Sequence, residues 1–284
     1  MKRFGLLILT ALLLVGLLAG CGGAEGQDEA LIGAWAWDDT SSWEYVFEAD
    51  GSGVRGAQGH GEETFTWSTN ASGRLTLNLD SGREQWDYTI AGANTLTLTS
   101  RNLTYTYSRL GQRADFIGSW AWDEDAGWEY VFEADGTGTR GFPPQVESFE
   151  WATTADGRLR LRYGGTYSEW TYLITDSTLT MTHTRFANTE FHYARVLDEG
   201  NPALVGTWHW VDDSDWEYIF DANGQGKRGW LVDGDVEDFT WTTTANNQII
   251  MRFGDYVEGW GYSIAGNRLT LRFEDIVFQY TRQD

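Results

Sequence analysis

The chain contains one sequence unit three times, and this repetition limits the folds open to it more than any other feature. The segments "GAWAWDD", "GSWAWDE" and "GTWHWVD" bring Trp35, Trp120 and Trp208 into register. The segments "WEYVFEADGSGVRG", "WEYVFEADGTGTRG" and "WEYIFDANGQGKRG" follow, and the copies end on "YTYSR", "FHYAR" and "FQYTR". The fold must therefore be assembled from three similar units.

Within each copy, apolar and polar residues alternate with a period of two, and no window keeps a helical period. In the first copy this pattern predicts short strands at 33–38, 43–49, 51–56, 64–69, 74–79, 84–91, 94–100 and 103–109. Turn sequences such as "ADG" and "ASG" separate the strands. One apolar and one polar face predict an all-β protein of three tandem small antiparallel up-and-down meanders of about eight strands each, closed as barrels or folded as sandwiches. A propeller is the main rival, but its blade strands would be covered on both faces.

The N-terminus has the features of a bacterial lipoprotein signal. Lys2 and Arg3 precede an apolar run that ends in "LAGC", and Cys21 is the only cysteine. We therefore expect a signal peptide over 1–20 and acyl chains such as palmitate on Cys21, with 21–30 as lipidated cysteine and tether. The expected location is the extracytoplasmic face of the cell membrane, with the N-terminal lipid as the membrane contact.

Composition narrows the choice of partner. The chain has 16 Trp, 13 Tyr and 14 Phe, so each unit has large side chains for a core without disulfides. Its formal net charge of -22 argues against nucleic acid and against a bare anionic lipid surface.

Each copy begins with Gly-x-Trp and ends with an arginine on its last strand. This resembles the lipocalin-like, or calycin-like, pattern found in uncharacterised bacterial surface lipoproteins. The resemblance implies eight-stranded β-barrels in which the final arginine packs over the first-strand tryptophan. The implied structural pairs are Trp35 with Arg109, Trp120 with Arg195, and Trp208 with Arg282. The expected domains are repeat 1 (31–112), repeat 2 (113–198) and repeat 3 (199–284).

Ligand binding, if it occurs, is expected at the barrel mouth, because barrels this short and aromatic should be largely filled by their own side chains. Trp37, Trp122 and Trp210 lie beside the first hairpin of each copy and are candidate ligand-binding residues. Arg55, Arg140 and Arg228 recur after the glycine turn and are candidates for contact with an anionic head group, or else surface or ring-stacked arginines.

Other recurring polar residues point to structure more than to chemistry. The acidic first hairpins suit solvated turns or, alternatively, calcium ligands. Glu44, Glu129 and Glu217 should point outward as cross-strand partners. The four histidines occupy four different repeat positions, and no nucleophile, phosphate loop or metal spacing occurs. We therefore expect no enzyme, no cofactor and no metal site.

These features together predict a membrane-anchored extracytoplasmic lipoprotein that acts as a non-catalytic binding or display module. The expected partner is a small apolar ligand, a cell-surface glycan or a surface protein. The alternative is a structural spacer with fully packed barrels and no small ligand.

Overall fold

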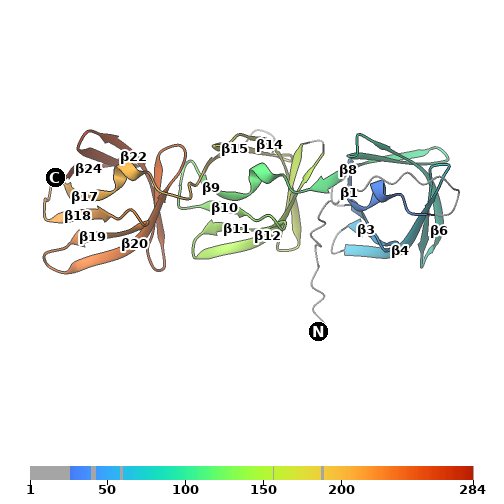
Figure 1. Ribbon diagram of the computed structural model, residues 1–284, viewed down its shortest axis with the longest axis horizontal. Helices are drawn as coiled ribbons and strands as arrows, with labels where there is room; N and C mark the ends of the chain where they lie inside the picture. Colours follow the sequence, from blue (N-terminus) through green and yellow to red (C-terminus); the bar gives the residue numbers. More distant parts are fainter. Residues whose placement is uncertain (1–25, 40–42, 58–59, 156, 187–188, 284) are drawn as a thin grey trace. The chain divides into compact units, whose positions relative to one another are not determined.

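The computed structural model describes residues 26–39, 43–57, 60–155, 157–186 and 189–283, and it is built almost entirely of short antiparallel strands (Figure 1). Cys21 and the expected signal peptide lie outside the described residues. Repeat 1 contains eight strands: β1 (Gly33–Trp37), β2 (Trp43–Phe47), β3 (Ser52–Ala57), β4 (His60–Asn70), β5 (Arg74–Leu79), β6 (Gly82–Ala91), β7 (Thr95–Ser100) and β8 (Leu103–Gly111). The predicted strands of repeat 1 are thus all present, with β4, β6 and β8 longer than expected.

The other repeats follow the same plan. Repeat 2 contains β9 (Gly118–Trp122), β10 (Glu129–Phe132), β11 (Thr137–Phe142), β12 (Gln145–Thr154), β13 (Arg158–Tyr163), β14 (Thr166–Ile174), β15 (Thr178–His183) and β16 (Glu190–Arg195). Repeat 3 contains β17 (Gly206–Trp210), β18 (Trp216–Phe220), β19 (Gln225–Trp230), β20 (Asp235–Thr243), β21 (Gln248–Arg252), β22 (Val257–Ala265), β23 (Arg268–Phe273) and β24 (Ile276–Arg282). Three short 3₁₀-helices, which the strand pattern did not predict, precede the repeats: η1 (Glu29–Leu31), η2 (Ala114–Phe116) and η3 (Pro202–Leu204).

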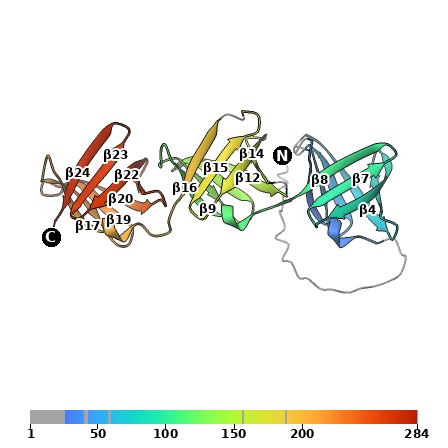
Figure 2. The ribbon, with the colours of Figure 1, turned by 90° about the horizontal axis from the view of Figure 1, so that it is seen from above.

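The expectation of three separate barrels is wrong in its count. Strands β17 to β24 form a closed eight-stranded antiparallel barrel, in which β22, β23 and β24 lie side by side (Figure 2). The strands of repeats 1 and 2 instead belong to one 16-stranded sheet in the order β1 to β8, then β12-β11-β10-β9-β16-β15-β14-β13. Additional pairings join β1 to β8 and β12 to β13. The described strands therefore form two hydrogen-bonded sheets.

The physical reason is the length of β8. This strand continues to Gly111, where Leu110 and Gly111 pair with Thr154 and Thr153 of β12. The corresponding strand β16 ends at Arg195, and only an isolated bridge, Val196 to Thr244, joins it to repeat 3. Two extra paired residues are thus enough to merge two sheets into one.

Contacts divide the chain into two compact units. One unit takes the residues up to Arg113 together with Trp151–Trp170. The other takes Ala114–Glu150 and Thr171–Asp284. Each unit therefore combines strands from two adjacent repeats.

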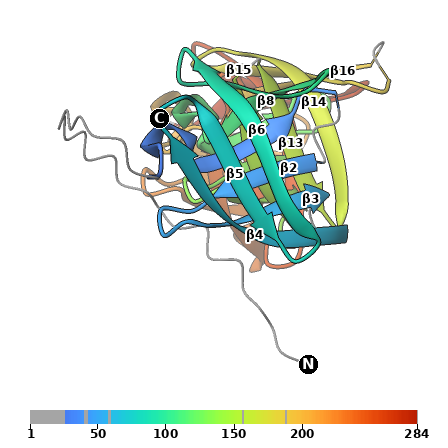
Figure 3. The same ribbon diagram turned by 90° about the vertical axis from the view of Figure 1, so that its right-hand side faces the viewer.

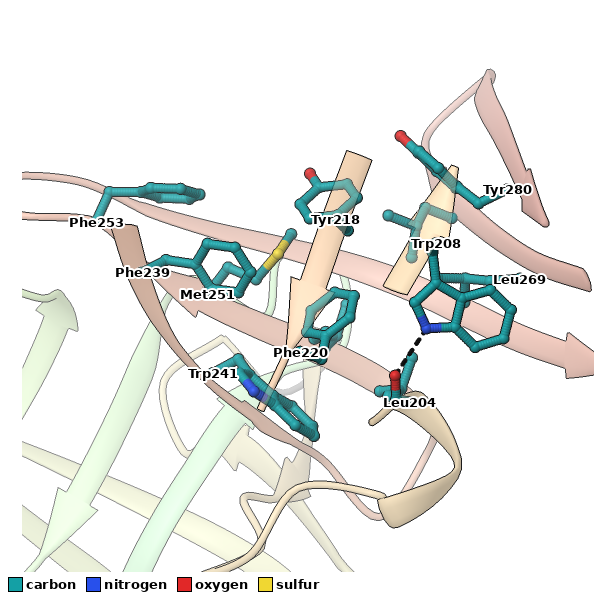
Figure 4. Close-up of a cluster of buried hydrophobic side chains, with 12 residues drawn as sticks. Leu204, Trp208, Tyr218, Phe220, Phe239, Trp241, Met251, Phe253, Leu269 and Tyr280 are labelled. Carbon is teal, nitrogen blue, oxygen red and sulfur yellow. Dashed lines mark hydrogen bonds between the residues drawn. The ribbon is translucent and has the colours of Figure 1, made fainter. Parts of the chain in front are cut away.

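A tryptophan and an arginine close one end of each repeat in the same way. Trp208 is fully buried and donates its indole N–H to the carbonyl of Leu204 in η3, at 2.7 Å (Figure 4). The guanidinium of Arg282 lies over the Trp208 ring, 4.5 Å from its centroid. The equivalent distances are 4.0 Å for Arg109 over Trp35 and 4.1 Å for Arg195 over Trp120. These are the structural pairs that the lipocalin-like pattern implies.

In repeat 1 the arginine also binds the segment that precedes β1 and includes η1. Arg109 donates from Nη1 to the carbonyl of Ile32 at 2.6 Å and from Nε to the carbonyl of Ala93 at 2.8 Å. Its Nη2 donates to the carbonyl of Ala30. One side chain therefore satisfies carbonyls from η1 and from the β6–β7 turn, besides covering the tryptophan.

Aromatic rings fill the space above this closed end. In repeat 3, Phe220 contacts Trp241 and Phe239 edge-on, with ring centroids 5.2 and 5.5 Å apart (Figure 4). Tyr218 stacks on Phe220 at 5.4 Å. Edge-to-face pairs of this kind add to the stabilisation from burial itself. The lower part of the barrel is therefore packed with side chains, as the sequence predicts.

Adjacent repeats meet through the outer face of the first two strands. Glu44 on β2 is only 8% exposed and accepts a hydrogen bond from Arg160 on β13 at 2.5 Å. Glu129 on β10 is 4% exposed and pairs with Arg252 on β21. Burial raises the pKa of both carboxyl groups. These glutamates point outward as expected, but their partners are arginines of the following repeat and not cross-strand neighbours.

We expect Arg109→Ala to lower the free energy of unfolding by about 2 kcal/mol, because it uncovers Trp35 and removes the hydrogen bonds to the carbonyls of Ala30, Ile32 and Ala93. Urea unfolding followed by tryptophan fluorescence measures this. Arg74→Ala is the matched control, since its ion pair with Asp87 is exposed and should contribute under about 1 kcal/mol. Equal effects of the two variants would contradict the structural role.

Two glycines of β22 test the contact between repeats 2 and 3. A Cβ at Gly259 would lie 2.6 Å from the backbone nitrogen of Gly127, whereas a Cβ at Gly261 would meet its nearest atom at 3.6 Å. We expect Gly259→Ala to destabilise the protein by about 1–3 kcal/mol and Gly261→Ala to have little effect. Differential scanning calorimetry of both variants would decide, and similar melting curves would argue against a tight contact.

Candidate functional site

Repeat 3 contains a pocket at the end of the barrel opposite the Trp208–Arg282 pair. Its volume is about 260 Å³. Trp210, the last residue of β17, and Trp216, the first of β18, flank the hairpin at this end. The complete lining is Trp210, Trp216, Tyr218, Arg228, Glu258, Trp260, Leu271, Phe278 and Tyr280.

The walls of the pocket are aromatic because inward positions of several strands meet there. Trp210 contacts Trp216 and Phe278 edge-on, with ring centroids 6.4 and 5.8 Å apart. Trp260 also lies 5.8 Å from Phe278. The hydroxyls of Tyr218 and Tyr280 point away from the Leu204 end (Figure 4). The rings thus hold one another in place and leave flat faces around the hollow.

Arg228 and Glu258 form the charged part of the lining, and every N–H group of the arginine side chain has an acceptor. Nη1 and Nη2 donate to the two oxygens of Glu258 at 2.7 and 3.0 Å. Nε donates to Glu237 at 2.9 Å. The hydroxyls of Tyr218 and Tyr256 accept the remaining hydrogen bonds, at 3.3 and 2.9 Å. Such a bidentate pair fixes the guanidinium in one orientation.

The electrostatic balance of this cluster is one arginine against two carboxylates. The hydrogen bond from Arg228 lowers the pKa of Glu237, and burial raises the pKa of Tyr218 to about 12. The guanidinium also lies over the Phe253 ring, 4.0 Å from its centroid. Because the arginine is already neutralised and saturated, it offers little to an anionic ligand.

The same arrangement recurs in repeat 1. Arg55 donates to both oxygens of Glu84 at 2.7 and 2.9 Å and to Glu63 at 3.0 Å. The indole of Trp86 donates to Glu84 at 3.1 Å, as Trp260 does to Glu258 at 3.0 Å. In repeat 2 the position of this glutamate is occupied by Ser168, which accepts from Trp170 at 2.9 Å. The three mouths are therefore not chemically identical.

The structure brings the candidate ligand-binding residues Trp210 and Arg228 into one pocket. Their counterparts lie at the same repeat positions. Trp37 packs edge-on against Tyr105 at 5.6 Å, and Trp122 faces Tyr193 across β9 and β16. Arg140 pairs with Glu147 at 2.8 Å.

The half-buried carboxylates Glu84 and Glu258, which bind Arg55 and Arg228, were not predicted from the sequence. The recurring segments "EQW" and "EGW" were a usable signal, because a glutamate two residues before an inward tryptophan also points inward on a strand.

Two further findings, on metal ligands and on membrane-spanning helices, apply to the described residues alone. No group of three or more His, Cys, Asp or Glu side chains lies close enough there to hold a metal ion. In the acidic hairpin of repeat 2, Asp125 accepts a hydrogen bond from the backbone of Gly127 at 3.0 Å, which is the geometry of a local turn. Over the same ranges, no helix has the length and apolar character needed to cross a bilayer.

Comparison with models of known protein families gave no match, and comparison with curated proteins gave none at a significant level.

The arginine clusters predict a dependence of stability on pH. The hydrogen bond from Arg55 lowers the pKa of Glu84 from its usual 4.5, so the folded state favours the ionised carboxylate. This contribution to stability is complete well above pH 4.5 and disappears as the pH falls through the lower folded-state pKa.

We expect Glu84→Gln to be less stable than the natural protein at about pH 7, and the difference to shrink as the pH falls below about 4.5. Urea unfolding at a series of pH values measures it. Asp87→Asn, which alters an exposed ion pair on the same strand, is the control. A difference that stays constant over the whole pH range would contradict this role for Glu84.

Proposed function

We propose that this protein is a non-catalytic binding module, and that the aromatic pocket of repeat 3 is its ligand site. The observation that carries the proposal is the combination of a filled closed end with a hollow mouth. Trp208, Leu204 and Phe220 are at most 1% exposed, whereas the rings around Trp210 surround about 260 Å³ of space. Protein interiors are normally close-packed, and a concave apolar hollow of this kind is typical of a ligand site.

The ligand that fits best is small, uncharged and flat or apolar on at least one face. Pockets for drug-sized ligands run from roughly 300 to 1,000 Å³, so 260 Å³ suits a single ring or a short apolar group. Three tryptophans and a phenylalanine supply stacking surfaces. Because Arg228 has all its donors engaged, an anionic head group is a poor match. A ring of a cell-surface glycan and a small apolar molecule both remain good matches.

The proposal includes the cellular setting that the N-terminal sequence indicates. A lipid on Cys21 would hold the three lipocalin-like repeats at the extracytoplasmic face of the cell membrane, so that the pocket samples molecules at the cell surface. The support for this setting is the signal-like segment and the lone cysteine at its end. Metabolic labelling with a clickable palmitate analogue tests it, and loss of label in Cys21→Ser is the expected result.

The decisive experiment is a titration of the mature chain, made without lipid, with the neutral fluorescent probe Nile red. We expect saturable binding, with displacement by N-acetylglucosamine if the ligand is a glycan and by an apolar alcohol such as cyclohexanol if it is not. Trp210→Ala should weaken binding by about tenfold or more, because it removes one wall of the pocket. Trp122→Ala, at the same position of repeat 2, is the matched control.

The competing function is that of a structural spacer, and the buried pairs between repeats favour it. Glu44 with Arg160 and Glu129 with Arg252 tie neighbouring repeats together. A folded, cooperatively melting sample that binds neither the probe nor the competing compounds would leave the spacer as the better explanation. Binding that Trp210→Ala does not alter would place the ligand elsewhere.

A further inference from the structure

The two contacts between repeats join corresponding strands in the same order, with the paired arginines two positions apart on the fifth strand. In each case the outer face of the first two strands of one repeat meets the outer face of the fifth strand of the next. Glu44 on β2 meets Arg160 on β13, and Glu129 on β10 meets Arg252 on β21. An interface of this head-to-tail kind joins two different surfaces, so it leaves one unused surface of each type at the ends of a chain of repeats.

In the contact between repeats 2 and 3, small residues of repeat 2 pack against larger residues of repeat 3. Ala121, which is fully buried, packs with Ala126 against Ile250. Gly127 sits beside Val257, so close that a Cβ on it would lie 3.3 Å from the valine side chain. The first repeat has the same small residue, Ala36, which is 1% exposed.

On the unused face of repeat 3 these residues are replaced by larger and more acidic ones. Repeat alignment places His209 at the position of Ala121 and Asp215 at the position of Gly127. Glu217 occupies the position of Glu129 and lies 3.9 Å from the Nδ1 atom of His209. The face of β17 and β18 therefore keeps the glutamate of the internal contacts while it gains bulk and negative charge.

On the unused face of repeat 1, the residues that contact the preceding repeat in repeat 3 are replaced by a smaller residue and a basic one. Strands β4, β5 and β6 lie side by side there (Figure 3). Thr76 takes the position of Ile250, and Arg83 takes the position of Val257. Thr76 is only 8% exposed between its exposed neighbours Arg74 and Asn78, so the middle of the face is recessed. Arg74 and Arg83 line a groove of about 640 Å³ on this repeat.

The two end faces are therefore complementary in size and in charge. The contact between repeats 2 and 3 sets alanine against isoleucine, and the ends would set His209 against the recess at Thr76. The contact between repeats 2 and 3 sets glycine against valine, and the ends would set Asp215 against Arg83. Thr76 and Asn78 replace the arginines of the internal contacts, so Glu217 would keep His209 as its partner. Opposite charges at matching positions favour association of the two faces, whereas like charges there would oppose it.

We propose that the face of β17 and β18 in one molecule binds the face of β5 and β6 in a second copy of the same chain, in the geometry already used between neighbouring repeats. The copies would thus associate head to tail. The partner is a second copy because the face that fits is present on this chain, with the size and charge changes that the fit requires.

Sedimentation velocity of the mature chain over a concentration series tests the proposal. We expect reversible association that weakens as salt is raised, since opposite charges face each other. Arg83→Asp and Asp215→Arg should each weaken self-association by about tenfold or more, because each sets like charges together. An equimolar mixture of the two variants should recover association, since every contact in an alternating assembly again pairs opposite charges.

Two outcomes would overturn the proposal. One is a natural protein that stays monomeric over the whole concentration range. The other is association that neither charge reversal changes, or that the mixture of variants does not restore. Because Arg83 and Asp215 are exposed, thermal melting of both variants should match that of the natural protein and so separate loss of association from loss of folding.

Discussion

The packing of one arginine on one tryptophan organises each repeat. Arg109, Arg195 and Arg282 come from last strands, and Trp35, Trp120 and Trp208 come from first strands, so each pair joins the two ends of a repeat. The indole N–H reaches back to the short helix that precedes the repeat, as in the bond from Trp120 to the carbonyl of Phe116 at 2.8 Å. A strand meander with no disulfide gains in this way a fixed closed end, against which the remaining aromatic rings pack.

The end of the barrel opposite the Trp–Arg pair contains the pocket. In repeat 3, side chains fill the end of the barrel near Trp208. At the opposite end, near the β17–β18 hairpin, the inward side chains surround a small pocket. Arg228 and Glu258 hold each other in place, so the pocket has a rigid polar corner without a net positive charge. This combination supports a neutral ligand with a flat face and explains why recurring arginines need not mark an anion site.

On the outer surfaces, contacts between repeats depend on pairs of glutamate and arginine. Buried glutamates on β2 and β10 require arginines from the following repeat, since an unpaired buried carboxylate would be strongly destabilising. The equivalent strands of repeat 3, β17 and β18, have His209 beside Glu217. In repeats 1 and 2 the following repeat covers this surface. Terminal and internal surfaces therefore differ at His209 and Asp215 on repeat 3 and at Thr76 and Arg83 on repeat 1, and these differences are the basis for the proposed association of copies.

Much of this could be predicted from the sequence, and the reasons are local. Period-two alternation places one set of side chains on each face, so it predicted the eight strands of repeat 1 and the aromatic core. The Trp–Arg pairs were expected from the resemblance to the lipocalin-like pattern. Trp210 was placed at a barrel mouth because it adjoins the first hairpin. The tertiary structure alone decided the rest. Sheet number depended on two residues at the end of β8, and the burial of Glu44 depended on Arg160, which lies far away in the sequence. Alternation identifies the face on which a residue lies, but only the packing of distant segments decides whether that face is covered, and by what.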